Sequence, residues 1–86
     1  MHELSVAMEI CRIAEERLEP HRRSSLRRVG VLVGTDAGIE PSNLEFCLEA
    51  LLSQPPFGQA VPIIQHTAGH DLALAFLQVD DACPDD

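Results

Sequence analysis

Several residue types that mark common functional classes are absent from this 86-residue sequence. It has no tryptophan, tyrosine or lysine, and its six cationic residues against fourteen acidic ones give a net charge of −8. Nucleic acids and anionic membrane surfaces bind cationic faces, so neither is expected as a partner. No apolar run approaches the ~20 residues of a transmembrane helix, and no secretory signal is visible. A single cytoplasmic domain is therefore expected.

Cysteine is also scarce, and none of the three cysteines belongs to a Cys-x-x-Cys pair. A structural zinc site needs about four Cys or His ligands, so neither structural zinc nor a disulfide framework is expected. Cys11 and Cys47 fall on apolar helix faces and should be buried thiols. Cys83 lies in an acidic tail, residues 80–86, that we expect to be disordered. Without a P-loop, a nucleophile elbow or a Cys–His arrangement, the chain is not expected to be an enzyme.

The spacing of apolar residues predicts two helices and three strands within one domain, residues 1–79. Steps of three and four predict helices over residues 3–19 and from Pro41 to Pro55, the first with Leu4 on its apolar stripe and an Arg12–Glu16 pair outside. Alternation and β-branched residues predict strands over residues 26–34, 59–66 and 71–79. In the last strand, Leu72, Leu74 and Phe76 should share one face.

This order, helix-strand-helix-strand-strand, predicts an α+β fold in which two helices pack on one face of a small three-stranded mixed sheet. A right-handed crossover makes the first two strands parallel if they are neighbours, and Pro62 favours an edge position for the second. Residues 67–70 are short enough for a hairpin that pairs the last two strands. His66 and His70 flank that turn, as exposed turn residues or as a metal-chelating pair.

The first residues of the chain bring several nitrogen ligands together. The Met1 amine, the backbone nitrogens of His2 and Glu3, and the His2 imidazole can surround one ion through five- and six-membered chelate rings. Such a nitrogen set suits square-planar Ni(II) or Cu(II) rather than magnesium or calcium, which prefer oxygen. The Glu3 carboxylate is an axial or outer partner in this hypothesis. The alternative is that His2 is an ordinary polar residue at a chain terminus.

Two segments resemble HypA, the family of nickel metallochaperones of hydrogenase maturation. Residues 1–5, Met-His-Glu-Leu-Ser followed by an amphipathic helix, resemble the start of that family. Val33-Gly34, then Gly38-Ile39-Glu40-Pro41 before the second helix, resemble its strand that ends in Gly and its Gly-hydrophobic-Glu loop. The resemblance covers nearly all of residues 1–79, a HypA-like nickel-binding domain.

The resemblance implies that the metal is Ni(II), held by Met1, His2 and Glu3, with Glu40 approaching it from the second helix. It implies two partners, the GTPase HypB and a hydrogenase large-subunit precursor. One departure is large, because the family's zinc module between the last two strands is replaced by residues 67–70.

Three functions follow from this combination. The first is a HypA-like accessory protein that delivers Ni(II) during maturation of a nickel-iron hydrogenase without the structural zinc module. The second is a HypA-derived interaction module of the maturation machinery that no longer carries metal. The third is a stand-alone α+β domain that associates through its sheet, and a homodimer is left open in every case.

Overall fold

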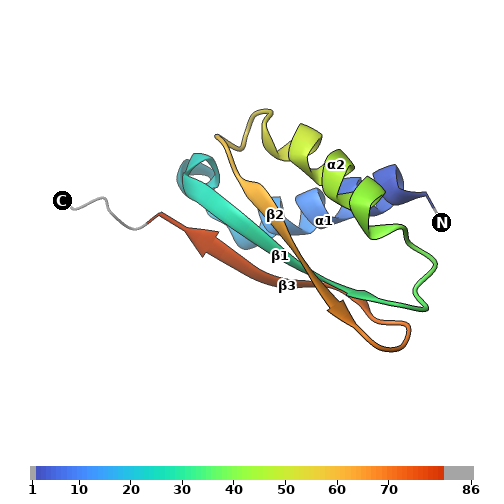
Figure 1. The fold of residues 1–86 in the computed structure, drawn as a ribbon. Coiled ribbons are helices and arrows are strands. Elements are labelled where there is room, and N and C mark those ends of the chain that lie inside the picture. The colour runs from blue at the N-terminus through green and yellow to red at the C-terminus, as the bar shows by residue number, and fades with distance from the viewer. Residues whose placement is uncertain (1, 81–86) are drawn as a thin grey trace.

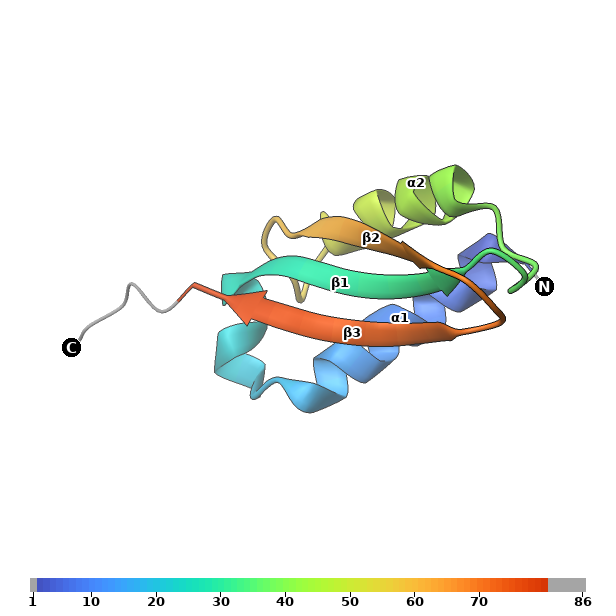
Figure 2. The same ribbon diagram turned by 60° about the horizontal axis from the view of Figure 1, so that its bottom comes forward.

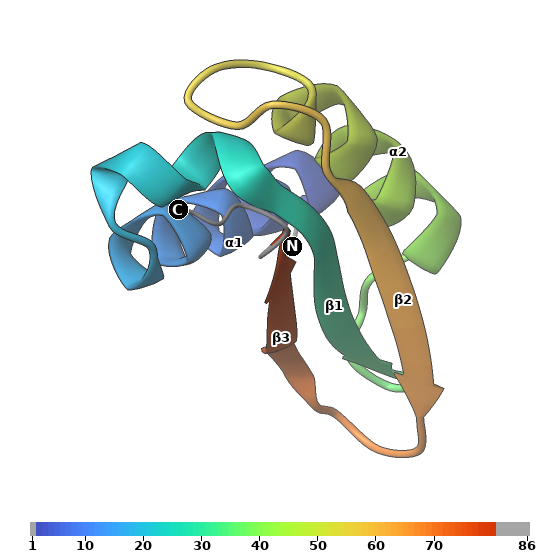
Figure 3. The ribbon, with the colours of Figure 1, turned by 90° about the vertical axis from the view of Figure 1, so that its left-hand side faces the viewer.

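Two helices cover one face of a three-stranded mixed sheet in the computed structural model, which describes residues 2–80 (Figures 1 and 3). The predicted α+β class and the predicted element order are confirmed. The elements in chain order are α1 (Glu3–Arg17), the 3-10 helix η1 (Pro20–Ser25), β1 (Leu26–Gly34), α2 (Pro41–Leu52), β2 (Val61–Thr67) and β3 (Leu72–Val79).

The end of α1 comes two residues earlier than predicted. Leu18 and Glu19 have extended backbones, and Pro20 accounts for Glu19 because a proline disfavours the α conformation of the residue directly before it. Pro20 then begins η1 where we expected only a polar connector. β1 has the bounds that were predicted from the sequence.

The strand order is β2-β1-β3, with β1 in the centre (Figure 2). β1 and β2 are parallel, and β2 is an edge strand, as the crossover and Pro62 predicted. The predicted hairpin is wrong, because β3 pairs antiparallel with β1 and not with β2. The short connection therefore crosses the carboxyl end of β1 before β3 returns along its other side.

Backbone hydrogen bonds hold that connection against the end of β1. Gly34 N–H donates to Asp71 O at 2.6 Å, and Thr35 N–H donates to Thr67 O at 2.9 Å. Gly34 permits this close approach because it has no side chain. A Cβ there would lie 2.8 Å from the Asp71 nitrogen and would overlap the Gly69 carbonyl group.

β3 does not keep the simple alternation predicted from its sequence. Its register against β1 shifts between Gly30 and Val31, so that Phe76 lies opposite Gly30 and Leu77 lies opposite Val29. The Phe76 ring occupies the space above Gly30, on the sheet face away from the helices. Phe76 therefore leaves the face of Leu72 and Leu74, and Leu77 takes the inward place.

The core lies between the helices and the inward face of β1. The fully buried side chains are aliphatic, and the largest are Leu26, Val29, Val31, Val33, Leu44, Leu48 and Leu52. Cys11 is buried as predicted, whereas Cys47 is only half-buried. Leu4 is 52% exposed, so it is not part of the buried stripe of α1.

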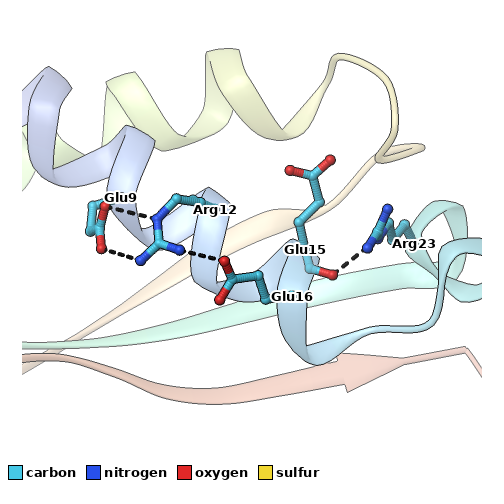
Figure 4. A network of polar contacts seen from close by, with 5 residues as sticks. All are labelled: Glu9, Arg12, Glu15, Glu16 and Arg23. Atoms are coloured by element: carbon cyan, nitrogen blue, oxygen red, sulfur yellow. Dashed lines mark hydrogen bonds and ion pairs between the residues drawn. The ribbon is translucent and has the colours of Figure 1, made fainter.

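The outward face of α1 is charged. Arg12 donates to Glu9 and to Glu16, which confirms the predicted Arg12–Glu16 pair (Figure 4). At the end of the helix, the Arg23 Nε donates to the Glu15 carbonyl at 3.0 Å and ties η1 to α1 (Figure 4). No helix within residues 2–80 has the length and apolar character that a membrane span requires.

Candidate metal site

His2 is the N-cap residue of α1 and has an extended backbone, with φ −86° and ψ 133°. Its carbonyl accepts from the Val6 N–H at 3.2 Å, while its side chain is exposed and caps no backbone N–H. The imidazole is therefore free to bind a ligand from solvent without loss of a helix contact. Met1, the other predicted end-group ligand, lies outside the described residues.

The backbone N–H groups of His2 and Glu3 lie where α1 offers no carbonyl acceptor, for a reason that lies in helix geometry, although the Glu3 N–H also contacts the Glu3 carboxylate. The first N–H groups of an α-helix have no carbonyl acceptor within the helix. A metal ion that replaces these amide protons would break no carbonyl hydrogen bond of the α1 ladder, and it would end only the contact of the Glu3 N–H with the Glu3 carboxylate. Two deprotonated amides would also carry two negative charges, which would offset a divalent cation near the positive end of the helix dipole. Magnesium and calcium, which take oxygen ligands, gain nothing from this arrangement.

The Glu3 carboxylate bonds to the start of α2. Its Oε2 accepts from the Glu40 N–H at 3.0 Å, and its Oε1 accepts from the Asn43 Nδ2 at 3.0 Å. These two donors, first the Glu40 amide and then the Asn43 amide, hold the pKa of the Glu3 carboxyl below its ordinary value. The ionised Glu3 carboxylate therefore links the first turn of α1 to the start of α2.

Glu40 lies beside these bonds and is itself the N-cap residue of α2. Its Oε1 accepts from the Asn43 N–H at 2.7 Å, and Pro41 supplies the first helical residue. The structure therefore brings Glu3 and Glu40 together, although the two are far apart in the sequence. The amino ends of α1 and α2 meet here (Figure 1). The exposed His2 is the N-cap residue of α1 and so directly precedes Glu3.

Asn43 contacts both acidic residues and was not identified from the sequence. Its position three residues after Glu40 is a local signal for helix capping. Its contact with Glu3 spans 40 residues of sequence, and no local pattern predicts a contact of that kind.

The two histidines near the 67–71 connection have different surroundings in the structure. His70 Nδ1 lies 2.9 Å from the Asp36 carbonyl oxygen, and His66 lies opposite Val33 in the parallel ladder. Within residues 2–80, the side chains of His, Cys, Asp and Glu form no group of three or more that could hold a metal ion.

The fold and the site define a small α+β domain whose two helix amino ends meet beside an exposed histidine. A family model described as "Hydrogenase/urease nickel incorporation, metallochaperone, hypA" matches residues 1–71. The chain belongs to the HypA family, which is a family of nickel metallochaperones.

Individual relatives agree with this assignment. The hydrogenase maturation factor HypA of Azotobacter chroococcum mcd 1 is 30% identical over 90 residues, which cover 98% of this chain and 80% of that protein. The HypA proteins of Chlorobium limicola and Psychromonas ingrahamii are 36% and 39% identical over 50 and 49 residues, 43% of each relative. No solved structure matches the chain.

Proposed function

We propose that this protein is a nickel carrier that delivers Ni(II) during maturation of a nickel-iron hydrogenase. The observation that carries the proposal is the exposed His2 at the N-cap of α1, directly before amides that the helix leaves without acceptors. Membership of the HypA family supplies the metal. The nickel ion is cargo in this proposal, so the chain is a carrier and not an enzyme.

The proposed ligands are the Met1 amine, the backbone nitrogens of His2 and Glu3, and the His2 imidazole. Glu40 is the proposed modulator of the site, and its cap on Asn43 gives it an alternative partner. It would leave that cap to approach the metal, through movement of residues 35–39. The Glu3 carboxylate contributes from outside, through its bonds to α2.

Delivery requires protein partners, and we propose the GTPase HypB and a hydrogenase large-subunit precursor in the cytoplasm. Leu4 and Met8, on the first turns of α1, are 52% and 57% exposed. Apolar side chains beside the cargo site provide contact area for an acceptor protein. We also propose that the oligomeric state be measured. β3 is an edge strand that pairs only with β1, so its outer edge could pair with a second copy in a homodimer.

We also propose that the protein functions without structural zinc. Residues 67–70 stand in the place where relatives are expected to carry the zinc module, and hydrogen bonds to residues 34–36 already fix this connection. Nickel release would then depend on the amino-terminal site itself.

Calorimetric titration with Ni(II) tests the carrier function on untagged protein that begins at Met1. We expect one Ni(II) per chain, and binding at least about tenfold weaker in His2→Ala. The matched control is His21→Ala, which removes another exposed histidine that lies in η1, beyond the opposite end of α1. An added amino-terminal tag should also weaken binding, because it moves the amine away from His2.

The alternative function is a HypA-derived interaction module that no longer carries metal. Equal Ni(II) affinity in the wild type and in His2→Ala, or no binding by either, would favour it over the carrier. Capture of HypB by both proteins would then show that partner binding persists without the metal site.

A further inference from the structure

Asn43 is the one described residue that donates to both acidic side chains near the amino end of α1. Its side-chain Nδ2 donates to Glu3 at 3.0 Å, and its backbone N–H donates to Glu40 at 2.7 Å. The Glu40 N–H in turn donates to Glu3 at 3.0 Å. The three residues form a closed set of hydrogen bonds between the first turns of α1 and α2.

Asn43 is first of all a residue of the α2 amino end, where its backbone N–H needs an acceptor. Its backbone bond to Glu40 satisfies that need, and any residue type at this position except proline would supply the same N–H. The side-chain amide is not needed for the cap. Its bond goes to a different helix, to the residue that directly follows His2.

That bond limits the movement of the chain where it enters α1. The Glu3 side chain and its backbone nitrogen share one Cα, so anchoring the carboxylate on α2 restricts the rotation of the Glu3 peptide. The nitrogens that chelate one metal ion must all point toward the position of that ion. Rotation of the Glu3 peptide would turn the Glu3 backbone nitrogen away from it. Neighbours that orient metal ligands typically change metal affinity by 10–100-fold when they are mutated.

We propose that Asn43 is a positioning residue for the nickel site, which acts by holding the Glu3 carboxylate on α2. This inference rests on the carrier function proposed above. Asn43 contacts no ligand atom in this proposal, and its effect on the metal passes through Glu3.

The first test compares Asn43→Asp with Ser42→Ala by nickel calorimetry. Asn43→Asp keeps the shape and the backbone N–H but places a carboxylate against the Glu3 carboxylate. We expect about tenfold weaker Ni(II) binding, at the lower end of the range because the contact is exposed. Ser42→Ala changes the neighbouring exposed residue of α2 and should bind as the wild type does. Equal affinities in Asn43→Asp and the wild type would overturn the inference.

A double variant separates positioning from a general loss of stability. When Glu3→Gln is combined with Asn43→Asp, the side-chain amide introduced at position 3 can donate to the carboxylate introduced at position 43. The amide oxygen at position 3 can still accept from the Glu40 N–H. We expect this swap to restore most of the affinity lost in Asn43→Asp. A double variant as weak as Asn43→Asp would contradict positioning through this bond.

A metal-free measurement completes the test. Hydrogen exchange at the Glu40 amide should be faster in Asn43→Asp than in the wild type, and slow again in the double variant, because that amide depends on the acceptor oxygen at position 3. Unchanged exchange would also count against the inference. Failure of the carrier function gives a different result, because the wild type would then bind no nickel or would bind it no better than His2→Ala does.

Discussion

At the scale of single residues, two glycines of β1 meet very different neighbours. A Cβ on Gly30 would contact the ring of Phe76, a side chain that is 37% exposed and can rotate away. A Cβ on Gly34 would contact the backbone of residues 69–71, which hydrogen bonds to β1 hold in place. Gly30 thus makes room for a side chain, whereas Gly34 makes room for the backbone of the connection.

We therefore predict that Gly34→Ala destabilises the fold more than Gly30→Ala does. Overpacking against a fixed backbone should cost Gly34→Ala about 2 kcal/mol or more. Gly30→Ala should cost about 1 kcal/mol or less, because displacement of the ring is partly offset by the lower chain entropy of Ala in the unfolded state. Urea unfolding of both variants measures the difference, and equal midpoints would contradict it.

Glu3 gives a prediction for pH. Its carboxyl has a lowered pKa in the folded chain, chiefly because the Glu40 N–H donates to it. A lowered pKa contributes stability that is present above the ordinary value of 4.5 and is lost as the pH falls through the folded value. The wild type should therefore be more stable than Glu3→Gln at pH 7, and the difference should shrink below pH 4.5. Urea midpoints across this range check it, and a constant difference would refute the assignment.

At the scale of elements, the amino ends of α1 and α2 meet, and an acidic side chain is placed at each. Two positive dipole ends side by side repel, and the carboxylates of Glu3 and Glu40 compensate them. This gives both residues a structural role that does not require metal. The capping role of Glu40 and its proposed role at the metal can be tested separately. A cap needs only an oxygen that accepts from the Asn43 N–H, which a shorter residue such as serine also provides.

We predict that Glu40→Ser retains most of the stability of α2 and that Glu40→Ala loses about 0.5–1 kcal/mol. Serine is a favoured N-cap residue, and alanine offers no acceptor for the Asn43 N–H. If Glu40 also modulates the metal, both variants should bind Ni(II) more weakly than the wild type. Urea unfolding and nickel calorimetry on the same two proteins check this. Unchanged nickel affinity in both would leave Glu40 with its cap alone.

The elements were largely predictable from the sequence, and their pairing was not. Apolar spacing indicated the helices, and the run of valines indicated β1 with its observed bounds. The hairpin between β2 and β3 was wrong because a short connection indicates proximity of two strand ends and not which strands pair. The crossing depends on hydrogen bonds between residues 34–36 and 67–71, which no local pattern encodes.

The candidate site shows the same division. His2 and Glu3 were predicted from the chemistry of the chain start and from resemblance to the family, and Glu40 from the resemblance alone. The structure brings Glu3 and Glu40 into one set of hydrogen bonds. Asn43 was missed because its side chain acts across two helices. The exposure of Leu4 was also missed, since helical periodicity alone does not tell where the second helix stops covering the first.

At the scale of the whole molecule, the core is built from every main layer of the fold. Buried hydrophobic side chains come from both helices, from β1, from the connection between β1 and α2, and from the segment before β2. No polar or charged side chain is buried among the described residues. A small domain that depends on zinc unfolds when the metal is removed, because the binding free energy is its folding free energy. Here hydrophobic burial supplies a source of stability that does not involve metal.

We therefore predict that the purified protein contains no stoichiometric zinc and unfolds cooperatively at the same temperature with and without EDTA. Circular dichroism during heating measures the midpoint in both conditions. Leu48→Ala is the control, because Leu48 is fully buried and its truncation should cost about 2–5 kcal/mol. In a domain of this size that cost lowers the midpoint by roughly 8 °C or more, which shows that the transition reports on the core. A transition that disappears in EDTA, while the untreated protein melts cooperatively, would show that a metal and not this core holds the fold together.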